Sequence, residues 1–242
     1  MKTLVYVLFL AALVSNIVCT AQSIGEYKDV THYQYAITWA PTYCKYLFRD
    51  HCVPNLPDRF FMHGIWAGDA SGRTVDNCRV EPPIPIGVLK KFEARLSKSW
   101  PPIIQGMTAF RLWGHEYRKH GVCLKDWTAT NYLNFADRVS LNNNITKLLE
   151  TNGIKISSTV KYSRGAIEKA IQTKIGAGFS MYLGCQQVGT LYYLKSAAIC
   201  IKKIDGTKFL NVYEFVSCPQ RIDPNYNNCG GGKTEEENIF LL

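Results

Sequence analysis

The stretch Trp-Gly-His-Glu-Tyr-Arg-Lys-His-Gly-Val-Cys, residues 113–123, crowds ionisable side chains of both signs into a short segment. We expect residues 110–123 to be helical. At 3.6 residues per turn, Glu116 and His120 share one face of such a helix, and Lys119 lies one turn from Glu116. The segment therefore predicts a cluster of an acid, a base and a cation on one helix.

The spacing of the two histidines in this segment argues against a metalloprotease. His115 and His120 are five residues apart and point about 140° from each other on a helix, whereas the zinc ligands of His-Glu-x-x-His are four apart. A solvated charge cluster is the alternative interpretation. Trp113 before the charges and Cys123 after them, however, indicate that the segment is tied to the core.

An earlier segment, residues 60–66 with the sequence Phe-Phe-Met-His-Gly-Ile-Trp, places His63 in an aromatic strand. Alone, it would be interpreted as a packed core histidine. Together, the two segments supply the groups that phosphodiester transesterification needs. A neutral imidazole accepts the ribose 2′-hydroxyl proton, an imidazolium protonates the leaving oxygen, and a cation stabilises the transition state. This chemistry needs no metal or other cofactor, and the 2′-hydroxyl makes RNA the substrate.

Residues 1–21 have the pattern of a secretory signal peptide. Lys2 precedes an almost uninterrupted apolar run over residues 4–18, and residues 19–21 suit cleavage after Ala21. A membrane anchor is the alternative, but about 15 apolar residues fall short of the roughly 20 that span a bilayer. We therefore expect a secreted, extracellular protein with no membrane segment.

Cleavage would remove Cys19 and leave an even number of cysteines. The eight that remain stand at positions 44, 52, 78, 123, 185, 200, 218 and 229. In an oxidising compartment, this predicts four disulfides. A zinc site is disfavoured, because no two cysteines have the two-residue spacing of zinc-binding motifs.

The charge balance favours a polyanionic partner. The chain has 28 Lys and Arg against 19 Asp and Glu, a formal charge of +9, and loses only Lys2 with the signal peptide. An excess of this size suits nucleic acid or an anionic surface. The candidates for phosphate contacts, each also compatible with an ordinary solvated face, are Lys90, Lys91, Arg95, Arg111 and Arg118.

No repeat, linker or change of composition divides the chain. We expect one domain over residues 22–242, with its core at about 33–229 and a flexible, solvated tail at 230–242. Helices and strands mix without regular alternation, which predicts an α+β fold with a mainly antiparallel central sheet and several packed helices.

Hydrophobic periodicity places the elements of this fold. Alternation predicts a half-buried strand at 33–39 and a second strand at 59–66. Asp205-Gly206 predicts a hairpin between strands 198–204 and 207–216. Helical periodicity, with proline and glycine at the ends, predicts helices through 89–96, 131–151 and 164–173.

The two histidine segments, in this order, resemble the active-site segments of the ribonuclease T2 family. These are secreted endoribonucleases, and they include the style self-incompatibility (S-type) ribonucleases of plants. The likeness extends to Trp39, Pro41 and Cys44, to Trp100-Pro101, and to the order of the cysteines. It covers about residues 33–229.

The resemblance implies a role for each matching residue. His63 matches the general acid of the family and His120 its general base, while Glu116 and Lys119 match the pair that supports the transition state.

Two further positions match residues that contact the substrate. His115 matches a phosphate-contacting histidine. Trp66 matches a base-stacking aromatic, and core packing is an equally good interpretation of it. Trp39 and Tyr43 are expected in the core.

The family's cysteine order implies the pairs Cys44–Cys52, Cys78–Cys123, Cys185–Cys229 and Cys200–Cys218.

The chain also departs from the family pattern. After Trp66, the usual proline and acidic residue are replaced by Ala67 and Gly68, with Asp69 displaced by one, which leaves the base preference open. Tyr117 and Val122 replace a usual Trp and Thr, and we interpret both as packing changes.

The resemblance implies a monomeric, secreted endoribonuclease that cleaves single-stranded RNA to 2′,3′-cyclic phosphate ends. The basic charge favours the self-incompatibility type, with a pollen-side recognition protein as a partner, over a housekeeping or defence ribonuclease. A binding or storage protein on the same scaffold is the alternative from another class.

Asn144 lies in the sequon Asn-Ile-Thr, so we expect a glycan there.

Overall fold

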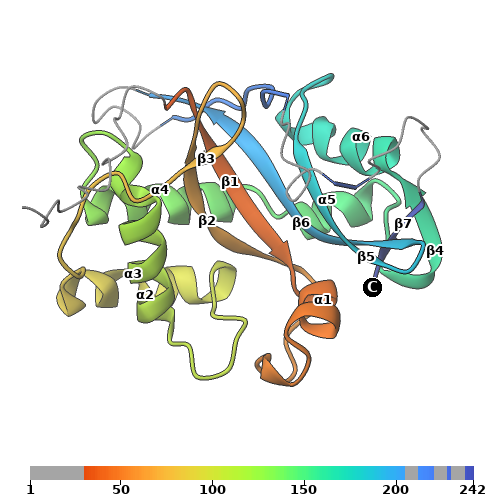
Figure 1. Ribbon diagram of the computed structural model, residues 1–242, viewed down its shortest axis with the longest axis horizontal. Coiled ribbons are helices and arrows are strands. Elements are labelled where there is room, and N and C mark those ends of the chain that lie inside the picture. The colour runs from red at the N-terminus through yellow and green to blue at the C-terminus, as the bar shows by residue number, and fades with distance from the viewer. Residues whose placement is uncertain (1–29, 205–211, 221–227, 230–237) are drawn as a thin grey trace, which may run out of the picture.

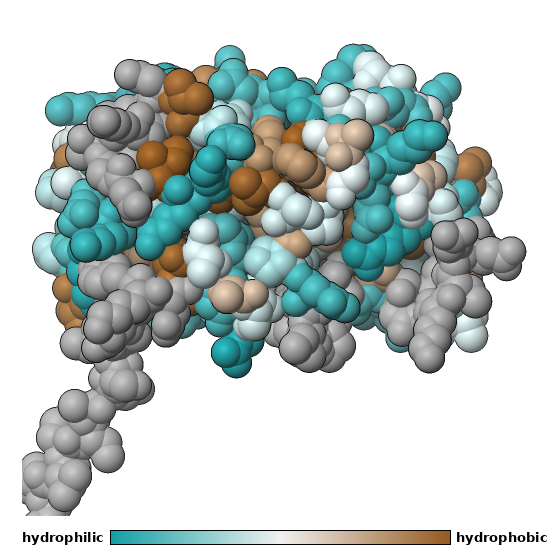
Figure 2. All heavy atoms as spheres, turned by 90° about the horizontal axis from the view of Figure 1, so that it is seen from above, coloured by the Kyte–Doolittle hydropathy of each residue, from teal (hydrophilic) through white to brown (hydrophobic). Residues whose placement is uncertain are grey.

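A computed structural model of the chain describes residues 30–204, 212–220, 228–229 and 238–242. The expected signal peptide at 1–21 and the expected turn at Asp205-Gly206 lie outside the described residues. Within them, no helix has the length and apolar character to cross a membrane. On the face that is uppermost in Figure 1, hydrophilic side chains are interspersed with smaller apolar groups (Figure 2).

The described residues form a seven-stranded sheet at the centre of the molecule (Figure 1). The strand order is β3-β2-β1-β6-β7-β4, and β5 also pairs with β6. Each pair is antiparallel except β6–β7, which is parallel. The strands are β1 (His32–Trp39), β2 (Phe60–Gly68), β3 (Thr74–Val75), β4 (Ser157–Ser163), β5 (Tyr182–Val188), β6 (Leu191–Lys202) and β7 (Asn238–Leu241).

Helices flank the sheet in two groups (Figure 1). The helices α2, α3 and α4 pack against one another, and α3 and α4 contact β2, whereas α5 and α6 contact each other beside β4. Their bounds are α1 (Ala40–Thr42), α2 (Ile86–Ser99), α3 (Ala109–Lys119), α4 (Ala129–Asn142), α5 (Ile145–Thr151) and α6 (Arg164–Ile175). The mixed, mainly antiparallel α+β fold is therefore confirmed.

Strand β1 differs from the predicted half-buried strand, because every one of its eight residues is buried. It lies between β2 and β6 in the middle of the sheet, so both of its edges are hydrogen-bonded to neighbouring strands. Tyr33 on one face packs edge-on against Trp127 at 5.3 Å. The alternating polar residues, such as Gln34 and Thr38, are buried instead in hydrogen-bonded positions.

The single long helix predicted over residues 131–151 is wrong, since the structure has two helices separated at Asn143 and Asn144. The Asn143 side chain donates to the carbonyl of Val139, and Asn144 Oδ1 accepts from the backbone N–H of Lys147 at 3.0 Å. Asparagine side chains compete in this way with the backbone bonds of a helix. Asn144 thereby becomes the N-cap of α5.

The prediction of a solvated tail is wrong for residues 238–242. Strand β7 inserts between β6 and β4, and Ile239 and Leu241 are buried. The Trp39 indole N–H donates to the carbonyl of Leu242 at 3.0 Å. The apolar residues after the acidic run bury enough surface to outweigh the polar composition that suggested a frayed end.

All four disulfides form as the resemblance implied, joining Cys44–Cys52, Cys78–Cys123, Cys185–Cys229 and Cys200–Cys218. The last of these holds the segment after the predicted hairpin turn beside β6. There the N–H of Val216 donates to the carbonyl of Cys200, and the N–H of Lys202 to that of Glu214.

Candidate active site

A cavity of about 550 Å³ lies between α3 and the sheet. Its wall contains all six residues that the sequence predicted for the site: His63 and Trp66 from β2, His115, Glu116 and Lys119 from α3, and His120 at the end of α3. Two segments about 50 residues apart in the chain are thus brought together.

A β-bulge presents His63 to this cavity. Gly64 pairs with Ala36 and Met62 pairs with Ile37, so His63 is an extra residue in β2 without a partner in β1. Such a bulge re-aims a side chain that regular alternation would direct elsewhere. The His63 side chain is 38% exposed, and its Nδ1 lies 3.2 Å from Thr38 Oγ1.

Glu116 lies between the two candidate catalytic histidines. Its Oε1 is 3.6 Å from His63 Nε2, and its Oε2 is 4.0 Å from His120 Nε2. The Trp66 indole N–H donates to Oε2 at 2.9 Å. With 3% of its surface exposed, this carboxyl group is held in a position from which it contacts both imidazoles.

The close approach of β2 to Glu116 requires glycine at position 64. A Cβ there would lie 2.5 Å from Glu116 Oε2 and 2.9 Å from Trp66 Nε1. Gly64 therefore permits the carboxylate–indole hydrogen bond that no larger residue would leave intact.

The apolar face of α3 fixes these groups against the core. Thr108 caps the helix by accepting from the N–H of Arg111. Trp113 is fully buried and donates to the carbonyl of Trp100, and Tyr117 packs against Tyr132 at 5.6 Å. The interpretation of Tyr117 as a packing residue agrees with this contact.

The helix ends earlier than the predicted residue 123. His120 is its C-cap, and a single 3₁₀ turn, Gly121–Cys123, follows. Glycine is a poor helix former, and the bond from Cys123 to Cys78 fixes the turn. His120 thus projects from a helix terminus that a disulfide clamps to the segment after β3.

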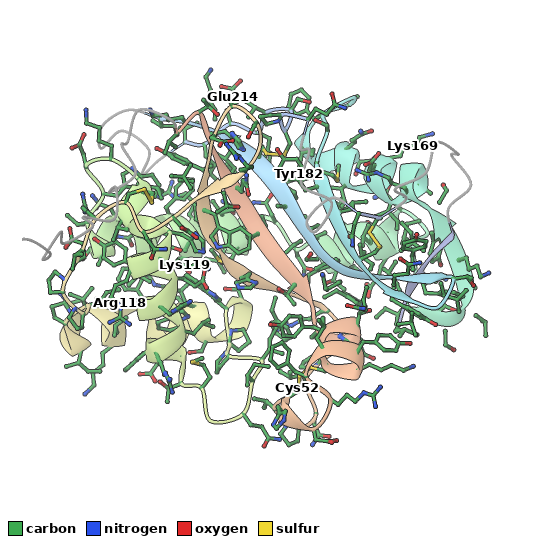
Figure 3. The ribbon with its side chains drawn as sticks, in the orientation of Figure 1. Cys52, Arg118, Lys119, Lys169, Tyr182 and Glu214 are labelled. Atoms are coloured by element: carbon green, nitrogen blue, oxygen red, sulfur yellow. A yellow bond between two sulfur atoms is a disulfide. The ribbon has the colours of Figure 1, made fainter. Side chains whose placement is uncertain are left out.

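Lys119 lies on the cavity side of α3, where its Nζ is 3.9 Å from Asp76 Oδ2. Figure 3 shows Lys119 toward the sheet and Arg118 away from it.

The candidate phosphate contacts Lys90, Lys91, Arg95, Arg111 and Arg118 are all exposed and do not line the cavity. Arg95 is instead paired with Asp137 at 3.0 Å.

Burial favours neutral groups in the empty cavity. Burial, and then the charge of Lys119, lowers the pKa of His120 to about 2. The same two causes lower the pKa of His63. Burial raises the pKa of Glu116 to about 7, opposed by the hydrogen bond from Trp66 and the charges of His115 and Lys119. An anion entering the cavity would therefore favour protonation of the histidines.

His115 and Trp66 both line the cavity. His115 is exposed, and its charge lowers the pKa of both Glu116 and His120. Trp66 is half-buried, with its ring 5.0 Å from those of His63 and His120. It both packs and lines the cavity.

Sequence reasoning did not assign the other wall residues to the site, among them Thr38, Tyr43, Asp76 and Lys195. Tyr43 was expected in the core but is half-buried at the wall, whereas Trp39 is fully buried as expected. These residues come from β1, the turn after α1, the segment after β3, and β6. No spacing in the sequence relates them to the histidine segments.

Asp69, the displaced acidic residue, is held by its own turn. Its Oδ1 accepts from the backbone N–H groups of Ser71 and Arg73 and from the Ser71 hydroxyl. It does not line the cavity. Asp69 therefore lies outside the candidate site.

The sequence profile of the Ribonuclease T2 family matches residues 30–218. The chain belongs to the ribonuclease T2 family. It is 26% identical over 212 residues to Intracellular ribonuclease LX of Solanum lycopersicum, covering 84% of this chain and 82% of that one. To Ribonuclease S-F11 of Nicotiana alata it is 27% identical over 150 residues, covering 60% and 73%.

The solved structure of RNase NT in complex with 5′-AMP has the same fold. Its TM-score is 0.69 at 22% identity, covering 88% of this chain and 98% of that one. The protein is thus an endoribonuclease of the ribonuclease T2 type.

Proposed function

We propose that this ribonuclease T2 protein cleaves single-stranded RNA by metal-independent transesterification. Neutral His120 accepts the proton of the ribose 2′-hydroxyl, and the 2′-oxygen attacks the adjacent phosphorus. The bond from phosphorus to the 5′-oxygen breaks, and protonated His63 gives its proton to that oxygen. The products are a 2′,3′-cyclic phosphate and a free 5′-hydroxyl.

One observation carries this proposal: two imidazoles and a lysine surround one buried carboxyl group in a single cavity. Lys119 supplies the positive charge that the phosphorane-like transition state needs. Glu116 positions both imidazoles and stabilises whichever of them is charged. No metal is required, because the imidazoles perform both proton transfers.

Burial accounts for the neutral base, and the bound substrate accounts for the protonated acid. The lowered pKa of His120 keeps it neutral, as a general base must be. His63 is more exposed and faces the cavity, so the negative charge of a bound phosphate acts on it directly and raises its pKa. The substrate itself thereby favours the protonated acid.

The direct test is cleavage of a dinucleoside monophosphate in the presence of a chelator, with the products identified by ³¹P NMR. We expect a cyclic phosphate signal and a rate unaffected by the chelator. Cleavage of the matching 2′-deoxy substrate, or loss of activity with the chelator, would contradict the mechanism.

Secretion and glycosylation are further parts of the proposal. Asn144 is exposed, and its N-cap bond uses Oδ1, whereas a glycan attaches through Nδ2. Expression in a secretory host should yield a mature chain that begins at Gln22. Replacing Asn144 with Gln should remove one glycan mass, measured by intact mass spectrometry.

For the biological role we propose a style self-incompatibility ribonuclease that acts as a monomer and meets a pollen-side recognition protein. The basic charge supports this, as does the likeness to Ribonuclease S-F11. The likeness to Intracellular ribonuclease LX supports a housekeeping or defence role instead. Transcript confined to the style would favour the first role, and transcript throughout the plant the second.

A further inference from the structure

A second β-bulge lies beside the cavity, in the pair β5–β6. Gly184 pairs with Ser196 and Cys185 pairs with Leu194, so Lys195 is the extra residue. Both Lys195 and Ser196 line the cavity. A bulge re-aims the side chain of its extra residue, and here, as at His63, the extra residue is a wall residue of the cavity.

Lys195 is half-buried without a counter-charge. Among the residues that the structure describes, no carboxylate lies within ion-pair distance of its ammonium group. Burial lowers its pKa, which shows the cost of keeping the charge in this position. An uncompensated cation at a cavity wall is stabilised when an anion binds there.

The cavity is long enough to extend past the reacting groups. Lys119 lines it on the side of α3 and Tyr182 on the side of β5, with the broad face of β1 and β6 between them (Figure 3). Thr38 in β1 contacts His63 and pairs with Ser196, so two strand spacings, roughly 10 Å, separate the backbones of His63 and Lys195. Lys119 already stands beside His63 and His120 at the reacting centre.

We propose that Lys195 binds a phosphate of the RNA next to the one that is cleaved. The inference rests on the proposed cleavage of RNA at His63 and His120. It adds a second phosphate subsite on β6, which lies across β1 from the strand that bears His63. This subsite recognises the backbone without reading the bases.

The experiment compares two substrates with the purified mature protein. One is a dinucleoside monophosphate, which contains only the cleaved phosphate, and the other is a short oligonucleotide with the same central step and flanking phosphates. In Lys195→Met, kcat/KM for the oligonucleotide should fall about tenfold further than kcat/KM for the dinucleotide, the size of one charge-assisted hydrogen bond. Lys195→Arg should recover most of the loss.

Lys169→Met is the matched control, because it removes the same charge from the exposed face of α6, far from the cavity (Figure 3). It should leave both values unchanged. Equal losses on both substrates in Lys195→Met would overturn the inference, since they would place the lysine at the cleaved phosphate or in the fold. No loss on either substrate would also overturn it.

Salt dependence gives an independent readout. Each phosphate contact contributes about 0.7 to the slope of log affinity against log salt for a single strand. Lys195→Met should reduce the slope for the oligonucleotide by about that amount, and an unchanged slope would count against a phosphate contact. If the parent protein cleaves neither substrate, the proposed function fails instead, and the two failures are thus distinguishable.

Discussion

The two halves of the active site reach the cavity by different means. The helical half brings Glu116 and His120 together through regular spacing, and His120 ends up 5% exposed. The strand half depends on an irregularity, the extra residue at His63, whose side chain is 38% exposed. The buried histidine suits a base that stays neutral, and the open one suits an acid that gains its proton when substrate binds.

The largest expected effect is the loss of either histidine. His120→Ala and His63→Ala should each lower kcat/KM by about 10²–10⁴-fold, which is the usual contribution of proton transfer. The double variant should lose little more than the worse single one, because the two act as a unit. The measurement is cleavage of a dinucleotide by variants whose circular dichroism matches the parent. Near-parental activity of folded His120→Ala would end this assignment.

The disulfide that holds the turn after α3 should have the next effect. Cys78–Cys123 closes a loop of 45 residues and Cys44–Cys52 one of 8. Loop entropy predicts that removing the first with Ala at both positions lowers the free energy of unfolding by about 4 kcal/mol. Removing Cys44–Cys52 in the same way should lower the free energy of unfolding by less. Chemical denaturation of both variants gives the comparison, and a larger loss from Cys44–Cys52 would show that loop closure does not dominate.

The difference in burial predicts a pH dependence of stability. His120 has a pKa of about 2 when folded and an ordinary value of 6.5 when unfolded, so the unfolded chain binds more protons between these values. Stability therefore falls as the pH drops below 6.5, by up to about 3 kcal/mol at pH 4. Glu116 acts oppositely, because its raised pKa makes stability fall as the pH rises from 4.5 to about 7.

Comparison of the parent with His120→Asn isolates the histidine. We expect the variant to lose less stability than the parent on acidification from pH 6.5 to 4, measured by urea denaturation. Parallel curves for the two proteins would contradict the lowered pKa.

Trp66 joins the two halves, so its loss tests their coupling. Trp66→Phe removes the N–H that Glu116 accepts, and that hydrogen bond lowers the pKa of the carboxyl group. We expect kcat/KM to fall about tenfold, the size of one bond to a charged group, and the pH profile to shift as the pKa of Glu116 rises. A loss of kcat/KM with no change in the pH profile would indicate that Trp66 acts through packing alone.

The smallest effect belongs to His115. It is exposed at the cavity wall, so His115→Ala should cost less than tenfold in kcat/KM, as expected for loss of one exposed phosphate contact. The same dinucleotide assay measures it. A loss as deep as that of His120→Ala would assign His115 a part in proton transfer.

The sequence predicted the helical half better than the strand half for a physical reason. Helical spacing is regular, so Glu116 and His120, which are four positions apart, are predicted to share a face. A bulge depends on how two strands pair, and no sequence pattern around His63 or Lys195 predicts one. The same limit explains β7, whose apolar residues follow a polar run and pair with strands far away in the chain. The break at Asn143 and Asn144 comes instead from local side-chain bonds, which hydrophobic periodicity does not report.

The two bulges also shape the surface on which the RNA would lie. An extra residue bends its strand and tightens the local twist of the sheet, and β2 and β6 bear theirs on either side of β1. The local twist of this part of the sheet and the presentation of His63 and Lys195 at the cavity therefore depend on the same two backbone irregularities. Deleting either extra residue should change the twist of the sheet as well as remove the side chain from the cavity wall.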